Sequence, residues 1–392
     1  MKAAIYDPYL DTLGGGERYC LTVAEILLKN GWEMDLFWSG DKDLIPRAEN
    51  RFSLKLTGLK LIKDIFNLRA QKIDLIENQN QLKNIVAQKI AGPQNSTQKI
   101  KRWFSHYQQT KGYDLFFYLS DGSTPFLFAK KNILHVQVPF RFSLNPTQKI
   151  ANLAKFKIGK IQIICNSLFT QKFTQKIFPQ KSSVLYPPVD VEKFSPASSK
   201  KNYILSVGRF DNILNAKKQD VLISAFQTIS HQNPSWKLIL AGGSAQDPDQ
   251  NSYLKHLRFM AKDLPVEFVV NQPFSALQNL YSQSKIYWHA AGYQVDEDLH
   301  PEATEHFGIT IVEAMASGLV PLVVDKGGLP EIIKENKNGF LWSDLDQLTG
   351  KTQLLISHPK KLAKISQQAL LDCQQFSKDN FEKQLLLLVN SP

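Results

Sequence analysis

Residues 305–324 read EHFGITIVEAMASGLVPLVV, and this stretch predicts a turn, a helix and a buried strand in succession. Gly308 permits a tight turn into the helix, the apolar residues between Ile309 and Ser317 recur at helical spacing, and Gly318 stops the helix. The run VPLVV then continues as a buried strand. A helix that leads directly into such a strand is typical of an α/β fold with a parallel sheet.

The start of this helix has the features of a ligand site. We expect Glu305 just before the helix and Glu313 in its first or second turn. The backbone N–H groups of His306, Phe307 and Gly308 would have no partner in the helix, so they can donate to hydroxyl or phosphate oxygens beside the positive end of its dipole. Two carboxylates there can accept hydrogen bonds from a vicinal diol. The alternative is an ordinary surface helix with solvated glutamates.

Length and composition indicate a two-domain globular protein. The chain has 392 residues, of which 43% are hydrophobic and 21% charged, enough for two domains with a core each. No apolar run approaches the length of a membrane span, and Asp7 interrupts the apolar start of the chain. We therefore expect a cytoplasmic protein without a span or a secretory signal. Cys20, Cys165 and Cys373 are too far apart for a metal or redox motif, and we expect them buried and reduced.

The net charge of +11 is concentrated in the first half, since residues 1–190 carry +12 and residues 191–392 carry −1, which sum to +11. A basic face can hold an anionic membrane surface or a phosphate-bearing acceptor, so peripheral attachment to the inner face of the cytoplasmic membrane is our hypothesis. A merely soluble basic face is the alternative. No recognised nucleic-acid-binding motif is present, so we expect no nucleic acid partner, and an RNA-binding protein is only a third interpretation.

Alternating strand and helix patterns predict two doubly wound, Rossmann-like domains. In the first domain, residues 1–190, we expect a helix over residues 15–29 and exposed helices over residues 60–111 with a loop at 91–96. The strands of this domain are expected at KAAIYD, EMDLFW, YDLFFY, NILHV and IQIIC. The stretch LYPPVDVEKFSPASSK, residues 185–200, is rich in proline and serine and predicts a linker.

The second domain, residues 191–372, is expected to repeat the pattern. Its strands are expected at YILSVG, WKLILAGG, VEFVV, KIYWHA and VPLVV. Helices are expected between these strands and from Pro330, and the closing segment from about 359 to 390 is helical and apolar on one face. Because parallel strands gather their following loops at one edge, we expect ligands to bind in a cleft between the two domains.

Two further segments suit a diphosphate. In LGGGERY, residues 13–19, Gly15 opens a helix whose first N–H groups can meet a phosphate, although neither a dinucleotide fingerprint nor a P-loop is present. In SVGRFDNILNAKKQDV, Arg209 follows a strand, and Lys217 and Lys218 precede the next helix. Cations placed there can neutralise a diphosphate, Arg as a planar fork and Lys as a point charge. Solvated lysines are the alternative.

Taken together, these segments resemble glycosyltransferase family 4, whose members are retaining enzymes of the GT-B fold. The resemblance is carried by the two glutamates in the pattern E-x7-E, by the GG-x-E pattern after the first strand, and by the arginine and lysine of the second domain. The segments ICNSLFTQKF, YPPVDVEKF and DKGGLPEII extend it over nearly the whole chain. It implies two Rossmann-like domains facing an interdomain cleft, with a C-terminal helix, residues 373–392, that crosses back to the first domain.

The resemblance also implies roles for individual residues around the donor. Glu305 and the amides that follow it, through Gly308, would contact the donor sugar, and Glu313 would bind the ribose. Arg209 would stabilise the departing diphosphate together with Lys217.

Two details of these roles are less direct. Lys218 stays an alternative to Lys217 as the diphosphate contact, and Gly15 is the expected contact from the first domain.

One position departs from the family pattern. Many members have a histidine before a proline near the reacting sugar carbon, whereas NILHVQVPFR has Gln137 there. His135 lies two residues earlier and would point the same way on a strand, so either residue could line the sugar site. His289, at the end of a predicted strand, is interpreted as a satisfied core histidine.

The sequence therefore predicts a retaining, metal-independent transfer of a hexose from a nucleotide diphosphate sugar, GDP-mannose or a UDP-sugar, to a glycan or lipid-linked acceptor. No cofactor is expected, because the strings DPD at 247–249 and DED at 296–298 lie in polar loops and are interpreted as solvated turns. A phosphorylase-like enzyme that uses phosphate or a sugar phosphate is one alternative. A noncatalytic nucleotide-sugar binding protein is another.

Overall fold

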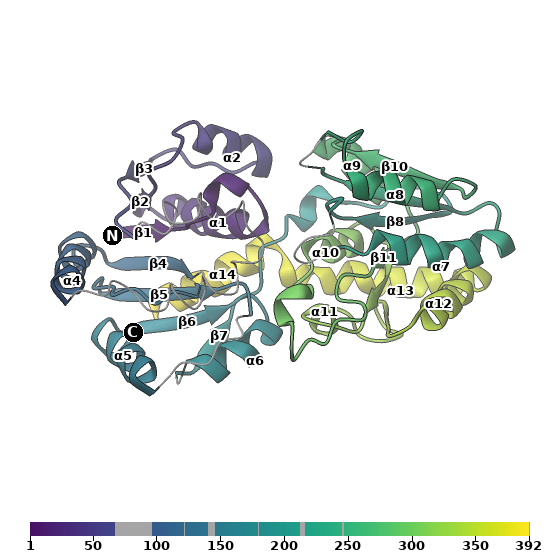
Figure 1. Cartoon of the computed structure of the whole chain (residues 1–392). Coiled ribbons are helices and arrows are strands. Elements are labelled where there is room, and N and C mark those ends of the chain that lie inside the picture. Colours follow the sequence, from purple (N-terminus) through teal and green to yellow (C-terminus); the bar gives the residue numbers. More distant parts are fainter. Residues whose placement is uncertain are drawn as a thin grey trace. The chain divides into compact units, whose positions relative to one another are not determined.

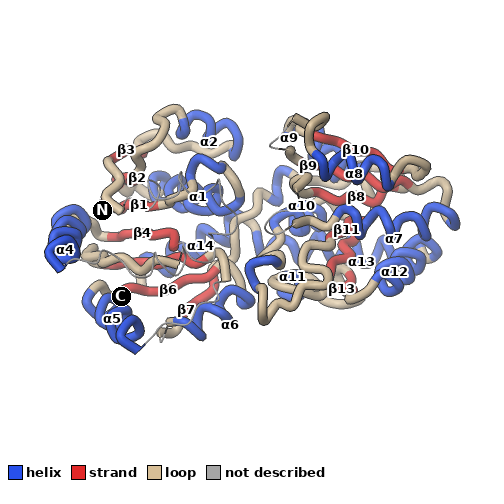
Figure 2. Tube along the Cα trace, in the orientation of Figure 1, coloured by secondary structure: helices blue, strands red, loops and turns tan. Residues whose placement is uncertain are grey.

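A computed structural model describes residues 1–391 except 67–95, 121, 140–145, 179, 212–215 and 245–246. The chain divides into two compact units. The first domain comprises Met1–Leu185 together with Glu382–Pro392, and the second comprises Tyr186–Phe381. Figure 1 labels the elements of both, and Figure 2 shows the strands of each domain grouped together and flanked by helices.

The first domain contains a parallel sheet of seven strands in the order β3-β2-β1-β4-β5-β6-β7. Central strands such as β4 are buried along their whole length, as expected for a sheet covered on both faces. The strands are β1 (Lys2–Tyr6), β2 (Glu33–Phe37), β3 (Leu59–Ile62), β4 (Leu115–Ser120), β5 (Lys131–Val136), β6 (Ile161–Cys165) and β7 (Ser182–Val184). The helices are α1 (Gly15–Lys29), α2 (Leu44–Phe52), α4 (Ser96–Thr110), α5 (Pro146–Ile158) and α6 (Leu168–Ile177).

The second domain contains a parallel sheet of six strands in the order β10-β9-β8-β11-β12-β13. The strands are β8 (Tyr203–Val207), β9 (Lys237–Gly242), β10 (Val266–Val270), β11 (Ile286–His289), β12 (Val320–Val324) and β13 (Phe340–Trp342). The helices are α7 (Gln219–Gln232), α8 (Ser252–Met260), α9 (Phe274–Gln283), α10 (Ile309–Ala316), α11 (Leu329–Ile332), α12 (Leu345–Ser357) and α13 (Pro359–Asp372). The last helix, α14 (Lys378–Asn390), begins in the second domain and belongs to the first domain from Glu382 on. The predicted α/β class and the two Rossmann-like sheets are confirmed.

Each sheet reverses its strand order once, next to its first strand. In the first domain the reversal lies between β1 and β4, and in the second it lies between β8 and β11. The loops that leave two such strands at their carboxyl ends diverge to opposite faces of the sheet, which leaves a crevice where α/β proteins bind ligands. The fold therefore singles out the loops after β8 and β11 in the second domain.

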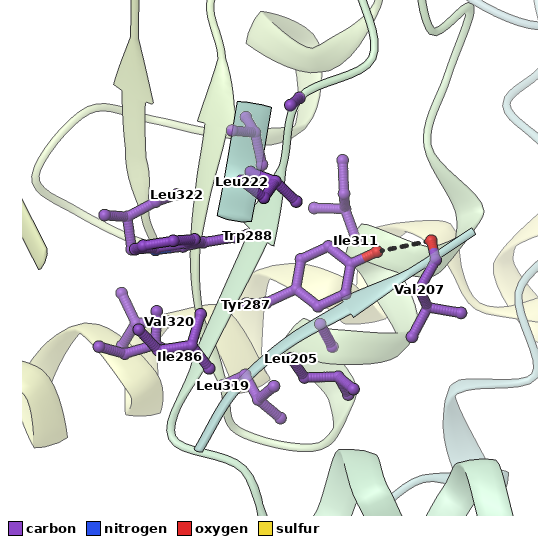
Figure 3. Packing of buried hydrophobic residues seen from close by; sticks show 14 of the residues in the cluster. Leu205, Val207, Leu222, Ile286, Tyr287, Trp288, Ile311, Leu319, Val320 and Leu322 are labelled. Atoms are coloured by element: carbon purple, nitrogen blue, oxygen red, sulfur yellow. Dashed lines mark hydrogen bonds between the residues drawn. The ribbon is translucent and has the colours of Figure 1, made fainter. Parts of the chain in front are cut away.

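The core of the second domain is built around β11, whose four residues are all buried. Figure 3 shows Trp288 and Tyr287 of this strand among aliphatic side chains of β8, α7 and β12. The Trp288 indole donates from Nε1 to Thr352 Oγ1 at 3.1 Å, and the Tyr287 hydroxyl donates to the Val207 carbonyl at 3.4 Å. The polar atoms of both large side chains are thus satisfied inside the core.

The segment between the domains differs from the expected linker. Val189, Val191 and Phe194 are buried in the core of the second domain, and Val189 forms an isolated bridge with Ser377. The prediction of a linker over 185–200 was therefore wrong for these residues. The prolines and serines of this segment predict an irregular backbone, but the apolar side chains between them pack in the core of the second domain.

The basic region of the first domain also differs in part from expectation. Leu59–Ile62 forms the edge strand β3 rather than a helix, because it pairs with β2. Ser96 begins helix α4 rather than ending a loop. The rest of the predicted helix and loop before Ser96 falls on residues 67–95, outside the described part of the chain.

The C-terminal helix joins elements of the first domain. The Lys29 ammonium contacts the Glu382 carboxylate at 2.9 Å, and the Lys131 ammonium donates to the carbonyls of Leu388 and Ser391 at 2.6 and 2.7 Å. The Lys131 contacts satisfy carbonyls at and just after the end of α14, where partners within a helix are lacking. The three cysteines are buried and free. No helix within the described ranges is both long and apolar enough to cross a membrane.

Replacing Trp288 by alanine should destabilise the second domain by about 3–5 kcal/mol, because it leaves a cavity beside β11 and removes the partner of Thr352. Phe259→Ala is the matched control, since Phe259 is 77% exposed and its loss should change the free energy of unfolding by less than about 0.5 kcal/mol. Denaturant titration followed by circular dichroism measures both. Equal transition midpoints for the two variants would contradict the assigned core.

Candidate functional site

The site is organised around one carboxylate oxygen. Glu305 Oε2 accepts from the Lys217 ammonium at 2.5 Å and lies 3.1 Å from His289 Nε2. Lys217 lies between β8 and α7, His289 ends β11, and Glu305 lies between β11 and α10. His289 thus lies at the end of β11, and Lys217 and Glu305 come from the loops after β8 and β11, the two strands at which the sheet order reverses.

The charges of this cluster are mutually dependent. Burial alone would raise the pKa of the Glu305 carboxyl, but the Lys217 charge and the His289 hydrogen bond outweigh it and hold that pKa well below its ordinary value. Burial lowers the pKa of His289, with Lys217 acting in the same direction and Glu305 against it. A neutral His289 that donates from Nε2 to the ionised Glu305 has an unprotonated Nδ1. That atom is buried and has no hydrogen-bond partner in the described part of the structure.

Glycines allow Lys217 to reach this position. A Cβ on Gly208, which follows β8, would lie 2.5 Å from Lys217 Cγ, so the lysine stem passes directly over the strand end. A Cβ on Gly242 would lie only 1.9 Å from the Gly208 carbonyl oxygen. Both positions therefore exclude a side chain. Lys218 instead has a positive φ of 55° and forms the N-cap of α7, so Lys217 is the lysine that reaches Glu305.

A second pair of glycines supports the Glu305 backbone. Gly328 N–H donates to the Glu305 carbonyl at 2.8 Å, and a Cβ on Gly328 would lie 2.3 Å from the His306 carbonyl oxygen. Gly327 has a φ of 64°, and its N–H donates to Glu297 Oε2 at 2.9 Å. The sequence DKGG thus forms a close backbone contact under the Glu305 loop.

The helix after Glu305 presents free donors. Gly308 has a φ of 113° and is the N-cap of α10, a conformation that favours glycine. No acceptor among the described residues pairs with the N–H groups of His306, Phe307 or Gly308. Burial lowers the pKa of His306 to about 4, so this imidazole is neutral at pH 7. The predicted amide donors are therefore available at the start of α10.

Glu313 lies on the second turn of α10 and is 6% exposed. Its Oε2 accepts from the Tyr281 hydroxyl at 3.0 Å. The Tyr287 hydroxyl and Thr310 Oγ1 form a hydrogen bond of 2.8 Å. Burial raises the pKa of Tyr287, and the negative charges of Glu313 and Glu305 act in the same direction. Both glutamates therefore influence one phenol, and neither is the solvated surface glutamate that was the alternative.

Arg209 is placed differently from the buried cluster. Its side chain is 68% exposed, and its Nε contacts Asp211 Oδ2 at 3.2 Å. The Arg209 carbonyl accepts from Gln219 Nε2 at 2.9 Å, which fixes the backbone beside α7. Among the contacts that the described residues show, the guanidinium pairs with one half-buried carboxylate, and its diphosphate role stays a prediction.

The first domain brings Gln137 to the glycine turn. Gln137 Nε2 donates to the Gly16 carbonyl at 3.3 Å. Glu17 Oε2 accepts from the Gly14 N–H at 2.5 Å and so caps α1, whose first residue is Gly15. The Glu17 carboxylate thus occupies part of the positive helix end. The contact of Gly15 with a diphosphate stays a prediction.

His135 does not fit a sugar site. It is 0% exposed, and its ring stacks on that of Tyr19 with centroids 4.1 Å apart. Burial lowers the pKa of His135 to about 3, so it is a neutral core side chain. The prediction that His135 lines the sugar site was wrong. Alternation along β5 predicts the face to which a side chain points, but it does not predict that helix α1 covers that face at His135.

The two acidic strings form local turns. Asp247 Oδ1 accepts from Asp249 N–H at 2.9 Å, and Asp296 Oδ1 accepts from Asp298 N–H at 3.1 Å. All four aspartates are exposed. Carboxylates that bond the backbone two residues on are ordinary turn formers.

His289, Tyr281 and Tyr287 are the site residues that sequence reasoning missed. The sequence predicts a satisfied core histidine at His289, yet its Nε2 contacts Glu305. Its position at the carboxyl end of a buried strand was the available signal. The two tyrosines follow no local pattern, because their polar groups meet α10 only through the tertiary fold.

A comparison with protein families bears on this second domain directly. Residues 190–371 match the family model described as glycosyl transferases group 1. The matched range includes the whole Lys217, His289 and Glu305 cluster and both predicted glutamates.

Curated relatives cover the same part of the chain. The chain is 31% identical over 224 residues to the GDP-Man:Man(3)GlcNAc(2)-PP-Dol alpha-1,2-mannosyltransferase of Xenopus laevis, which covers 53% of this chain and 43% of that protein. It is 26% identical over 211 residues to the alpha-1,3/1,6-mannosyltransferase ALG2 of Rhizomucor pusillus, covering 46% of each. It is 30% identical over 150 residues to spore coat protein SA of Bacillus subtilis, covering 37% of this chain and 36% of that one. The chain therefore spans less than half the length of these relatives in each match.

Solved structures resemble the whole chain. A glycosyltransferase from Rickettsia africae has a TM-score of 0.70 at 17% identity and covers 100% of this chain and 99% of its own. Anabaena HepE in complex with UDP-glucose has a TM-score of 0.65 at 19% identity, with 100% of both chains covered. At such identities the likeness concerns the fold, and the fold is the GT-B architecture.

Replacing Lys217 by methionine should lower the free energy of unfolding by about 3–5 kcal/mol at pH 7, because Glu305 is left as a buried charge without its cation. Lys218→Met is the matched control and should have little effect. Denaturant titration at several pH values measures both.

The deficit of Lys217→Met relative to the wild type should shrink as the pH falls towards 4. In the wild type the pKa of Glu305 is depressed, so its stabilisation is complete above the ordinary value of 4.5 and is lost as the pH falls through the depressed pKa. In the variant, burial raises that pKa, and protonation relieves the unpaired charge earlier. A deficit that is independent of pH would contradict the assigned ion pair.

Proposed function

We propose that this protein is a glycosyltransferase that moves a hexose from a nucleoside diphosphate sugar to a hydroxyl of a glycan or lipid-linked acceptor. The observation that carries this proposal is the ionised Glu305 carboxylate beside the free amides at the start of α10. A carboxylate accepts hydrogen bonds from sugar hydroxyls, and the amides donate to oxygens of the same ligand. The group 1 family match over this segment and the names of the relatives support the same reaction class.

In the proposed pose, different polar groups of the site contact the diphosphate and the ribose of the donor. Lys217 has three N–H donors, of which one goes to Glu305, so the others can meet the diphosphate. Arg209 is exposed and pairs with a single carboxylate among the described residues, so it can turn to the same group. Glu313 lies one turn further along α10 and would take the ribose hydroxyls.

The chemistry requires stabilisation of a leaving diphosphate. The bond between the anomeric carbon and the phosphate oxygen breaks, the electron pair leaves with the diphosphate, and the acceptor oxygen bonds to the carbon and releases a proton. A cation or N–H donor aimed at the developing charge lowers the activation barrier by about 3–4 kcal/mol. We propose that Lys217 and Arg209 supply this stabilisation without a metal ion, and that the anomeric configuration is retained.

GDP-mannose is the donor that we propose first, and a UDP-sugar second. Six of the relatives carry names that begin with GDP-Man and describe mannosyltransferases, and the solved structure of HepE contains UDP-glucose. The names of those relatives also include a lipid-linked acceptor, which supports the acceptor class proposed here.

The true donor should stabilise the protein against heat. A ligand present at 100 times its dissociation constant adds about 2.7 kcal/mol to the free energy of unfolding. A thermal-shift screen of GDP-mannose, UDP-glucose and the free nucleotides measures this. No shift with any nucleotide sugar would contradict the proposed donor site.

Arg209→Ala and Glu313→Gln should each reduce that shift without unfolding the protein. Arg209 would lose a diphosphate contact and Glu313 a ribose contact. Arg258→Ala is the matched control, because Arg258 is also an exposed arginine with one carboxylate partner, Asp249 at 3.4 Å. Wild-type shifts in both site variants would refute the assigned roles.

Product release separates an enzyme from a binding protein. With donor and acceptor glycan present, free nucleoside diphosphate should accumulate in proportion to enzyme, and Lys217→Met should lower its rate at least a hundredfold. Binding without release would favour a noncatalytic protein. Formation of a sugar 1-phosphate from donor and phosphate would favour the phosphorylase-like alternative.

A further inference from the structure

The outward face of α4 is apolar and aromatic. Ile100, Trp103, Phe104 and Tyr107 are 67%, 38%, 51% and 36% exposed. These positions are spaced by three or four residues, which places them on one stripe of the helix. Such a stripe normally faces the core. In α4 the core-facing residues are His106 and Thr110 instead, at 3% and 0% exposure.

The aromatic side chains of this stripe are held in place by rings from the loop before β5. The Trp103 and Tyr107 rings stack in parallel, with an interplanar angle of 1°, and both meet Phe128 edge-on at 5.3 Å. Phe128 stacks on Phe126, whose ring lies under the Lys155 ammonium at 5.2 Å. Because Lys155 belongs to α5, the ring contacts run continuously from α4 to α5.

Helix α5 repeats the arrangement. Ile150, Leu153 and Ile158 are 69%, 36% and 58% exposed, whereas Asn152 and Phe156 on the other face are buried. Together the two helices contribute seven of the fifteen exposed large hydrophobic side chains of the described residues. Figure 1 draws α4 and α5 at the same end of the first domain. We call the exposed side chains of these two helices the α4–α5 surface.

Positive charge surrounds these apolar side chains. Neither helix contains an aspartate or a glutamate, and between residues 81 and 181 the sequence has only Asp114 and Asp121 as acids. Lys101, Arg102 and Lys157 are exposed on the two helices, and Lys111 lies over the Tyr107 ring at 4.8 Å. Apolar and aromatic side chains with cations beside them are complementary to a surface that has anionic groups on its outside and an apolar layer beneath them.

We propose that the α4–α5 surface docks this protein onto an anionic lipid bilayer, with the apolar side chains inserted below the headgroups and the lysines and arginine at the level of the phosphates. Helices with one apolar and one basic side bind in the plane of the interface in this way. Tryptophan and tyrosine prefer the headgroup level, because their rings are apolar with one polar edge. Each basic side chain near an anionic surface contributes about fivefold to the partition constant.

The aliphatic members distinguish a bilayer from a nucleic acid. Single-stranded nucleic acid stacks its bases on aromatic rings along a basic groove, but Ile100, Ile150 and Ile158 offer no ring for a base. These three side chains are among the most exposed of the surface, and they gain most from contact with acyl chains.

Vesicle cosedimentation tests the proposal with the full chain and no sugar donor, so its result is independent of the transfer reaction. Three double variants are compared with the wild type. Ile100→Ser/Phe104→Ser removes apolar side chains, Lys101→Glu/Lys157→Glu reverses charge, and Phe259→Ser/Leu371→Ser is the control in the second domain, where the two side chains are 77% and 68% exposed. The vesicles contain phosphatidylcholine alone or with 30% phosphatidylglycerol, a composition chosen for about the charge of an anionic leaflet.

We expect the wild type and the control to bind the anionic vesicles within twofold of each other and at least tenfold more tightly than neutral vesicles. Both surface variants should lose at least tenfold in partition constant, with unchanged circular dichroism. Brominated lipids should quench fluorescence more in the wild type than in Trp103→Phe, which locates Trp103 at the interface.

Three outcomes would overturn the proposal. The first is wild-type binding by both surface variants, and the second is equal binding to neutral and anionic vesicles. The third is no vesicle binding together with tight, salt-sensitive binding of an oligouridylate that the surface variants lose, which would assign the surface to nucleic acid.

Discussion

A buried carboxylate, Glu305, is the constraint on which the second domain depends. Leaving it ionised without a partner would cost several kcal/mol, and the Lys217 ammonium and the His289 imidazole remove that cost. A side chain on Gly208 would clash with the lysine stem, and a side chain on Gly242 would clash with the Gly208 backbone. The cation, the imidazole and the glycines therefore form one unit, in which each member is required by the others.

The position of that unit follows from the sheet. The strand order reverses between β8 and β11. The loops after these two strands supply Lys217 and Glu305, and the end of β11 supplies His289. Because β11 is fully buried, its last residue, His289, is held in place at the edge of the sheet. The hydroxyls of Tyr281 and Tyr287 form hydrogen bonds with the Glu313 and Thr310 side chains of α10 and so fix this helix on the core. The packed core of the second domain thus holds the polar side chains at the edge of its sheet in fixed positions, as is usual for binding groups in α/β proteins.

The first domain shows the same division between a packed interior and a chemically distinct exterior. Its sheet buries aromatic rings and His135, whereas α4 and α5 keep aromatic and aliphatic side chains outside among lysines. A soluble domain rarely exposes so many large apolar residues in one place without a partner. The two faces of the molecule that carry chemistry, the Glu305 cluster and the α4–α5 surface, thus belong to different domains.

Much of this protein was determined by its sequence alone. Periodicity and turn residues predicted most strands, helix α1, the tight turn at Gly308 into α10 and the placement of the two glutamates around it. Alternation of buried residues and glycine conformations are local properties of the chain, which is why the sequence shows them. The helices α2, α5 and α12 and the strands β3, β7 and β13 were not predicted, and neither was the burial of Val189, Val191 and Phe194, since packing against distant segments decides them. The choice between Lys217 and Lys218, the contact of His289 with Glu305 and the burial of His135 were decided only by the tertiary structure. A pattern states which way a side chain points, but whether it meets a charge, solvent or a covering helix depends on residues far away in the chain.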